Sequence, residues 1–394
     1  MAFDKMIVKK LLKKFDDVPF VVKFPDGEEF KVGEGDPQAI IRANGGIDMG
    51  AVMKSPSLAL GEAYMDKTLE LEKGDLFEIL NMVLAKLEDF ASDFSGLTKI
   101  MKTSTSKKNQ KQEIATHYDI GNEFFELWLD ETMSYSCGYF KHETDTLYDA
   151  QVHKVEHILK KLNLKEGQTL LDIGCGWGYL LIAAAKKYHV KGVGITLSEE
   201  QYKKGQERIK AEGLEGQVEI RLMDYRDLEK SGMTFDRIVS VGMLEHVSRD
   251  NYPLFFKNID KVLNKKGIVL LHYISGRQEH DGDPWIKKYI FPGGIIPSLR
   301  EIIYLIGEYN YYTLDVESLR RHYEKTLLEW SKNYAAKRDV IDTMFEERFV
   351  RMWELYLVSC ASVFHNGICD IHQILFTKGV DNDLPMTRNY LYED

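Results

Sequence analysis

The chain has 394 residues, of which 44% are hydrophobic and 29% are charged, and these values indicate a soluble globular protein with two domains. A formal net charge of −10 excludes a broad basic surface for nucleic acid and makes any membrane contact local. No apolar run approaches the roughly 20 residues of a membrane span, and the first residues lack the pattern of a secretory signal. Four scattered cysteines without a Cys-x-x-Cys pair predict a reducing, cytoplasmic setting without a metal site.

The first 95 residues read as a small α+β domain. Residues 3–15 form an amphipathic helix whose lysines flank an apolar face, which fits either an interfacial helix on lipid or a helix packed within the domain. Residues 16–35 predict a hairpin that turns at Pro25-Asp26-Gly27, and a helix is expected from Asp75 to Phe90. Residues 96–112 are polar and basic and read as a linker.

Residues 113–394 alternate between strand and helix patterns, which predicts a parallel sheet covered on both faces. The later part is rich in helix patterns and supplies the last strands. Strands are expected near 169–173, 191–195, 217–222, 235–241, 267–274, 310–315 and 371–377, with helices near 179–188, 198–212 and 252–264.

Residues 170–178, Leu-Leu-Asp-Ile-Gly-Cys-Gly-Trp-Gly, are the most informative stretch. A short apolar strand runs into Gly174, Gly176 and Gly178, and a helix pattern follows at once, so the backbone turns sharply and a ligand can touch the main chain. Asp172 precedes the turn, where a carboxylate repels a pyrophosphate and attracts the ammonium of S-adenosylmethionine (SAM). The pattern therefore favours SAM over a nicotinamide dinucleotide.

Polar residues follow the next two strands, where ligands gather in such a sheet. Thr196, Ser198 and Gln201 offer neutral hydrogen bonds to a ribose, or they cap the following helix. Asp224 and Tyr225 fit an adenine amino group and ring face, or they form an ordinary turn. Both interpretations stay open at each place.

Glu245 follows the fourth strand and His272 lies on the fifth, so these side chains are expected to converge at adjacent strand ends. Together they favour proton chemistry, although either residue alone is more often structural. Cys137 lies beside Gly138 ahead of the sheet and offers a thiol and a backbone N–H, or it is a small buried hydrophobe. We expect Glu245 to stay ionised beside a cation.

Five stretches resemble cyclopropane-fatty-acyl-phospholipid synthase, a family similar to the mycolic acid cyclopropane synthases. They are Tyr-Ser-Cys-Gly-Tyr at 135–139, Leu-Asp-Ile-Gly-Cys-Gly-Trp-Gly at 171–178, Asp-Tyr-Arg-Asp-Leu at 224–228, Phe-Asp-Arg-Ile-Val-Ser-Val-Gly-Met-Leu-Glu-His-Val at 235–247 and Asp-Pro-Trp-Ile-Lys-Lys-Tyr-Ile-Phe-Pro at 283–292. The resemblance implies a Rossmann-like SAM-dependent methyltransferase sheet with helical lid insertions, plus the small N-terminal domain. It also implies methylene transfer from SAM to the cis double bond of acyl chains in membrane phospholipids.

The resemblance further implies a bound bicarbonate as general base and assigns site residues. The bicarbonate ligands fall on Cys137, Glu245, His272 and Tyr323, with backbone groups at Cys137 and Ile274. The cofactor contacts fall on Tyr135, Ser136, Gly174, Gly176, Thr196, Gln201, Asp224 and Tyr225, and Asp172, Leu197 and Ser198 at the ends of the first two strands complete the predicted set. In the family the N-terminal domain is thought to engage lipid and support a homodimer, which implies peripheral association with the inner face of the membrane.

Two other functions compete with this prediction. An N-methyltransferase of a small amine could use the same scaffold, but it needs neither a proton-accepting ion nor a lipid-engaging domain. A lipid-binding module with a degenerate SAM fold would be non-enzymatic, and the intact glycine turn argues against it. The products of an assay with SAM and lipid distinguish the three.

Overall fold

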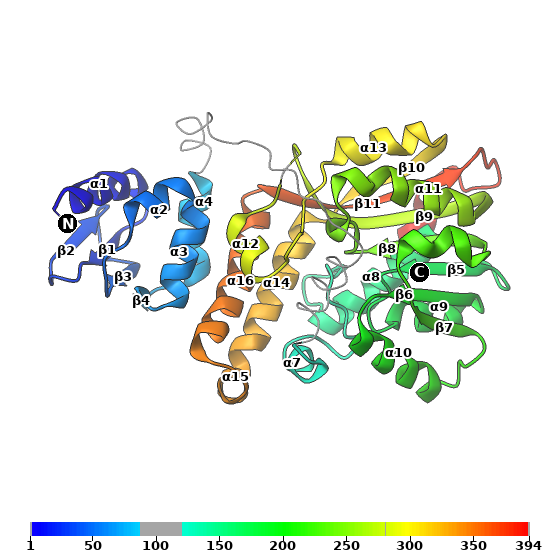
Figure 1. The fold of residues 1–394 in the computed structure, drawn as a ribbon, viewed down its shortest axis with the longest axis horizontal. Coiled ribbons are helices and arrows are strands. Elements are labelled where there is room, and N and C mark those ends of the chain that lie inside the picture. The colour runs from blue at the N-terminus through cyan, green and yellow to red at the C-terminus, as the bar shows by residue number, and fades with distance from the viewer. Residues whose placement is uncertain (1, 87–119, 280, 393–394) are drawn as a thin grey trace. The chain divides into compact units, whose positions relative to one another are not determined.

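The computed structural model describes residues 2–86, 120–279 and 281–392, which form two compact units (Figure 1). The first unit joins the N-terminal residues to residues 283–290 and 327–368, and the second holds the remaining described residues. The N-terminal unit therefore includes two segments that the sequence analysis placed in the domain 113–394. The predicted linker at 96–112 lies outside the described residues, and the three domain ranges stay a prediction.

The first unit contains a four-stranded sheet in the order β2-β1-β3-β4. β1 and β2 pair antiparallel, which confirms the hairpin, and Gly27 turns between them with φ of +85°. The strands are β1 (Phe20–Lys23), β2 (Glu29–Val32), β3 (Ala39–Ala43) and β4 (Leu69–Lys73). The helices are α1 (Ala2–Leu12), a 3₁₀ turn at Lys13–Phe15, α2 (Met49–Lys54), α3 (Pro56–Met65), α4 (Leu76–Ala85), α12 (Pro284–Tyr289), the second half of α14 (Arg320–Ala336), α15 (Arg338–Met344) and α16 (Glu347–His365).

The amphipathic N-terminal helix packs on its own domain. Leu12 and Phe15 contact the core of the small sheet, and Lys9 pairs with Glu28 next to the hairpin turn. These contacts support the packing interpretation for this part of the helix. Farther along, the helix expected from Asp75 is present as α4, and the Asp75 carboxylate caps it by accepting from the backbone N–H groups of the first turn. The end of that prediction, residues 87–90, lies outside the described residues.

The second unit is built on a seven-stranded sheet in the order β10-β11-β9-β8-β5-β6-β7. Neighbouring strands are parallel from β9 to β7, and β11 is antiparallel to both of its neighbours. The predicted strands are confirmed, but the expectation of a parallel sheet was wrong at one edge, because β11 pairs antiparallel with β9 and β10. The strands are β5 (Thr169–Ile173), β6 (Lys191–Thr196), β7 (Val218–Leu222), β8 (Phe235–Val241), β9 (Leu263–Gly276), β10 (Tyr311–Ser318) and β11 (Cys369–Lys378).

Helices cover both faces of this sheet, which confirms the α/β class (Figure 1). α11 (Tyr252–Val262) and α13 (Leu299–Glu308) contribute to the core on one face, and α8 (Leu147–Lys161), α9 (Tyr179–Tyr188) and α10 (Glu199–Ala211) contribute to the other. Shorter elements are α7 (Asn122–Glu126), α17 (Asn389–Tyr392) and 3₁₀ turns at Tyr225–Ser231, Leu244–His246 and Arg249–Asn251.

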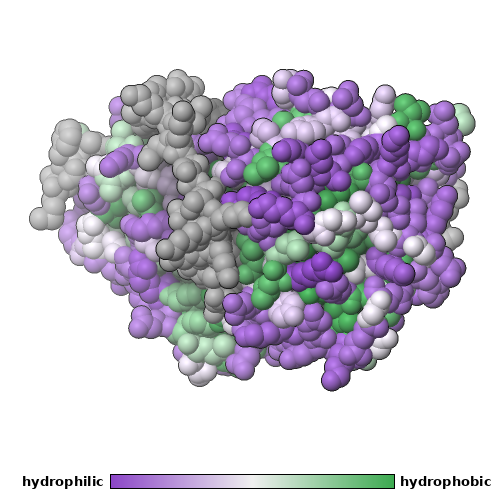
Figure 2. Space-filling view, turned by 45° about the vertical axis from the view of Figure 1, so that its right-hand side comes forward, coloured by the Kyte–Doolittle hydropathy of each residue, from purple (hydrophilic) through white to green (hydrophobic). Residues whose placement is uncertain are grey.

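The sequence analysis did not place α8, although its signals are present in the chain. Thr146 and Asp149 form a capping box at its start, and Val155, Ile158 and Leu159 lie on its buried face. On the face drawn in Figure 2, most of the described residues are hydrophilic. Among the helices of the described part of the chain, none has the length and apolar character needed to cross a bilayer.

Candidate active site

The glycine turn after β5 has the geometry that the sequence predicts. Gly174, Gly176 and Gly178 have φ of +81°, +55° and +82°, a region that side chains with a Cβ seldom adopt. A Cβ on Gly174 would lie 2.9 Å from the Met243 side chain, so the close approach also requires glycine. The turn brings the end of β5 and the start of α9 to the same edge of the sheet.

A cleft of about 1030 Å³, including its open mouth, lies at this edge within the second unit. Its walls come from the ends of β5, β6 and β8, the start of α9, one side of α8 and the loop before α8. Nine of the eleven predicted cofactor residues line it: Tyr135, Ser136, Asp172, Gly174, Gly176, Thr196, Leu197, Gln201 and Tyr225.

The other two predicted cofactor residues, Ser198 and Asp224, do not line the cleft. Ser198 caps α10 by accepting from the Gln201 N–H at 3.2 Å, and it also donates its own N–H to Thr196 Oγ1. Asp224 caps a 3₁₀ turn and binds the Arg226 guanidinium, with Nη2 2.5 Å from Oδ2. Both residues therefore have the helix-capping or turn contacts that the sequence analysis held open as alternatives.

The loop 133–136 is held against α8 by two side chains one turn apart. Gln151 Nε2 donates to the Ser136 carbonyl at 2.8 Å, and Lys154 Nζ donates to Ser136 Oγ at 3.0 Å. Lys154 is 3% exposed and lines the cleft with Asp172. Burial raises the pKa of Asp172 to about 7 and lowers the pKa of Lys154 to about 8, and each charge partly offsets the shift of the other.

Glu245 lies in the 3₁₀ turn after β8, and His272 lies on the adjacent strand β9. Glu245 Oε1 accepts from the Ile274 N–H at 2.7 Å, whereas Oε2 is buried without a hydrogen-bond partner among the described residues. Burial raises the pKa of Glu245 to about 7, so a substantial fraction of this carboxyl is protonated at neutral pH. The sequence analysis expected it to stay ionised beside a cation. Of the backbone groups of Ile274, a residue expected to contact an anion, the N–H is bound to Glu245.

His272 is held from the adjacent antiparallel strand. Its Nδ1 lies 3.1 Å from Gln373 Nε2, an amide nitrogen that donates, so a neutral ring carries its hydrogen on Nε2. Burial lowers the pKa of His272 to about 3, which keeps the ring neutral at pH 7. Nε2 is buried and has no partner within the described part of the chain.

Cys137 and Tyr323 complete the predicted catalytic set. Cys137 is fully buried, its thiol donates to the Gly138 carbonyl at 3.2 Å, and burial raises its pKa. Tyr323 is 9% exposed near the start of α14. As the structure describes the cleft, its lining does not include Cys137, Glu245, His272, Ile274 or Tyr323.

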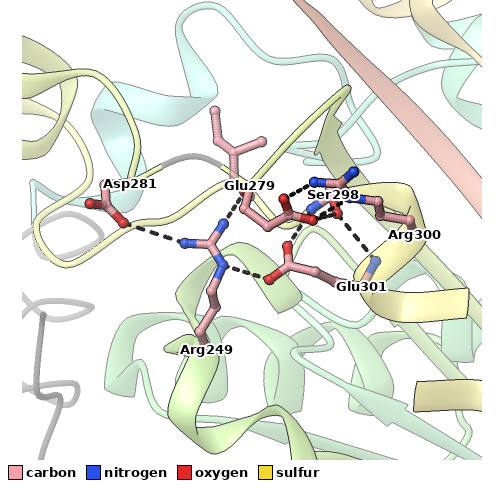
Figure 3. Close-up of polar contacts among 7 residues, drawn as sticks. Arg249, Glu279, Asp281, Ser298, Arg300 and Glu301 are labelled. Atoms are coloured by element: carbon pink, nitrogen blue, oxygen red, sulfur yellow. Dashed lines mark hydrogen bonds and ion pairs between the residues drawn. The ribbon is translucent and has the colours of Figure 1, made fainter. Parts of the chain in front are cut away.

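A polar cluster surrounds Arg249, four residues after Glu245 in the chain (Figure 3). Arg249 donates from Nε to Glu301 at 2.6 Å and from Nη2 to the Ile296 carbonyl at 3.1 Å, and Nη1 lies 3.4 Å from Asp281. The Glu245 carbonyl also accepts from the Ile295 N–H at 3.0 Å. The Glu245 carbonyl is therefore held by Ile295, and the segment that follows it is held through Arg249.

Several lining residues escaped the sequence analysis, namely Lys154, Trp177, Met243 and His246. Trp177 and His246 stand inside quoted motifs, so their positions next to Gly176 and Glu245 were a usable signal. Lys154 lies on the helix that was not placed, and a lysine among polar helix residues reads as a surface residue. Its burial depends on the loop 133–136 packing against α8.

The glycine turn and the cleft at the parallel strand ends define a SAM-dependent methyltransferase. Residues 105–374 match the family described as mycolic acid cyclopropane synthetase, and residues 7–95 match a domain of unknown function. The chain belongs to the cyclopropane synthase family and is a SAM-dependent C-methyltransferase.

Individual relatives agree with this membership. The cyclopropane-fatty-acyl-phospholipid synthase of Escherichia coli K12 is 41% identical over 86% of this chain and 87% of its own length. A probable fatty acid methyltransferase of Pseudomonas putida is 39% identical over 95% of this chain and 96% of its own. A mycolic acid cyclopropane synthase, CmaA1, solved with SAH and CTAB is 34% identical with a TM-score of 0.64, covering 68% of this chain and 98% of its own.

Proposed function

We propose that this enzyme transfers a methylene from SAM to the cis double bond of unsaturated acyl chains in membrane phospholipids. The observation that carries the proposal is that Glu245 Oε2 and His272 Nε2 are buried without a hydrogen-bond partner in the described part of the chain, near the carboxyl ends of β8 and β9. An N-methyltransferase acting on an amine lone pair has no need for such a pair.

The proposed chemistry makes two demands on the protein. SAM supplies an electrophilic methyl, and an alkene is a weak nucleophile, so the site has to exclude water from the carbocation that follows. A proton must then leave the transferred methyl for the ring to close, which requires an acceptor within hydrogen-bond reach. His272 is 1% exposed and the Glu245 Oε2 atom is buried, and both observations support the first demand.

We further propose that bicarbonate is the proton acceptor, held by Cys137, Glu245, His272 and Tyr323 together with backbone groups at Cys137 and Ile274. The donor chemistry fits an anion, because neutral His272 presents Nε2–H and a carboxyl with a pKa near 7 can also donate. An anion so bound would favour the protonated form of Glu245. Bicarbonate supplies the proton acceptor, and these side chains orient it.

The cofactor site comprises the nine cleft residues, and Ser198 and Asp224 support it through their caps. We also propose that the N-terminal domain engages lipid from the cytoplasmic side and supports a homodimer. Sedimentation of the protein with anionic and zwitterionic vesicles tests the first part, and the mass in solution tests the second.

The direct experiment incubates the protein with SAM and vesicles of monounsaturated phospholipid, followed by mass spectrometry of the acyl chains. We expect chains heavier by one CH₂ that no longer contain an alkene. Unchanged lipid together with methylation of an added small amine would transfer the assignment to N-methylation. In buffer depleted of carbonate we expect a slower rate that recovers on adding bicarbonate, and an unchanged rate would count against the ion.

A further inference from the structure

The Lys154 ammonium is buried, and the Asp130 carboxylate, followed by Asp172, raises its pKa against the larger effect of burial, yet neither carboxylate forms an ion pair with it among the described residues. Among the described residues, Nζ makes one hydrogen bond, to Ser136 Oγ at 3.0 Å. Lys161, two turns farther along α8 and equally buried, instead pairs with Glu317 at 2.6 Å and Asp315 at 3.2 Å. A buried charge normally requires such partners, so Lys154 has donors left for a ligand.

Asp172 is a buried carboxylate in the same cleft, with a charge opposite to that of Lys154. It is 3% exposed at the end of β5, lines the same cleft, and its Oδ1 is buried without a partner in the described part of the chain. The charges of Lys154 and Asp172 influence each other's pKa, yet no hydrogen bond joins them in the described structure. The cleft therefore presents a cationic and an anionic group on separate parts of its wall.

We infer that Lys154 binds the α-carboxylate of SAM together with Ser136, while Asp172 receives the α-ammonium. This inference deepens the proposed function, since it rests on SAM as the methylene donor. The amino acid end of SAM carries one charge of each sign, which is complementary to the charges of Lys154 and Asp172. The reverse orientation would place an ammonium against an ammonium and a carboxylate against a carboxylate in a buried site.

The Lys154 ammonium also influences where the sulfonium of SAM can lie. A buried ammonium repels it, so Lys154 favours a pose in which the carboxylate end lies at Ser136 and the sulfonium lies away from Nζ. The same electrostatics make the cleft selective, because a ligand that lacks the carboxylate leaves Lys154 buried and unpaired. The residue is thus a determinant of cofactor specificity as well as affinity.

The test compares SAM with decarboxylated SAM, which keeps the ammonium and the sulfonium but lacks the carboxylate. Calorimetric titration of the full chain without lipid gives Kd values that do not depend on which acceptor the enzyme methylates. For the wild type we expect SAM to bind at least ~10-fold more tightly than its decarboxylated form. Lys154→Met should weaken SAM binding about 10- to 100-fold and change binding of decarboxylated SAM less than about 3-fold.

Two further variants control the result. Lys160→Met removes a lysine from the same helix outside the cleft lining and should change neither Kd. Lys154→Arg keeps a cation and should retain most of the preference for the carboxylate. Equal losses for both ligands in Lys154→Met, or no loss for SAM, would overturn the inference. If Lys154→Met does not fold, the wild type decides, because equal affinity for the two ligands also overturns it.

Discussion

The two buried polar regions of the second unit differ in what surrounds them. Asp172 and Lys154 line the wall of an open cleft, where a ligand can supply the missing partners. Glu245 and His272 lie outside the cleft lining, and the protein itself binds one atom of each side chain while leaving the other without a partner among the described residues. The first region is thus suited to cofactor affinity, and the second to a step that follows binding, at a cost in stability.

Glu245→Gln gives the sharpest separation of the two regions. We expect turnover in the lipid assay to fall by about 1000-fold, because the variant loses a group placed for proton handling. Calorimetry should give a Kd for SAM within about 3-fold of the wild type, since Glu245 does not line the cofactor cleft. Near-normal turnover would refute the role of Glu245, and a large loss of SAM affinity would mean that the two regions are not separate.

Gly174→Ala acts on the cofactor side. A Cβ would meet Met243 at 2.9 Å and would force a side chain into a backbone with φ of +81°, so we expect SAM affinity to fall about 10- to 30-fold. Gly167→Ala is the matched control, because it has φ of +80° but no atom within 4 Å of its Cβ. It should lower stability by ~1 kcal/mol and leave the Kd for SAM unchanged. Similar losses of affinity in both variants would contradict the argument from close approach.

The pH dependence of stability should show the cost of burying Glu245. Its pKa is raised to about 7 from 4.5, so ionisation is harder in the folded protein, and the penalty is absent below pH 4.5 and complete above about pH 7. Glu245→Gln removes this penalty. Its gain in stability over the wild type should therefore grow from near zero at pH 4.5 to at most ~3 kcal/mol above pH 7. Denaturant unfolding at pH 5 and pH 8 measures the change.

Glu279 serves as a control of opposite sign for that experiment. The Arg300 guanidinium lowers the pKa of this carboxyl to about 2, with further hydrogen bonds from backbone and Ser298, so its ionised form is the favoured one (Figure 3). Glu279→Gln should be destabilising at neutral pH, and the difference should shrink as the pH falls from 4.5 towards 2. If Glu245→Gln followed the same trend, burial would not be the cause of its raised pKa.

Ser198→Ala is the smallest expected effect. Because Ser198 caps α10 and does not line the cleft, its loss should lower stability by ~1 kcal/mol and leave SAM affinity within about 2-fold. Thermal unfolding and calorimetry on the same sample check both values. A Kd that rises 10-fold or more would return Ser198 to the set of direct cofactor contacts.

Much of the fold was predictable because its signals are local. The apolar run before Gly174 and the helix pattern after it identify β5 and α9, and the same logic holds for the other parallel strands. Half of the small sheet was predicted, because the β1–β2 hairpin has a turn signal. β3 and β4 were not predicted, because a long segment separates them in the chain. Residues 283–290 and 327–368 carry no local sign that they pack with the N-terminal residues.

The sequence by itself predicted the glycine turn and the positions of the large sheet's strands along the chain, because turn chemistry and hydrophobic periodicity act over a few residues, and its motifs carried the resemblance to the family. Only the tertiary structure decided which polar groups are buried and which of their atoms are left unpaired. Lys154 reads as a surface lysine and is nine-tenths or more buried, and Asp224, which the sequence left open between a ligand contact and a turn residue, binds Arg226. Burial and pairing depend on segments far apart in the chain, such as β11 against β9 and the loop 133–136 against α8.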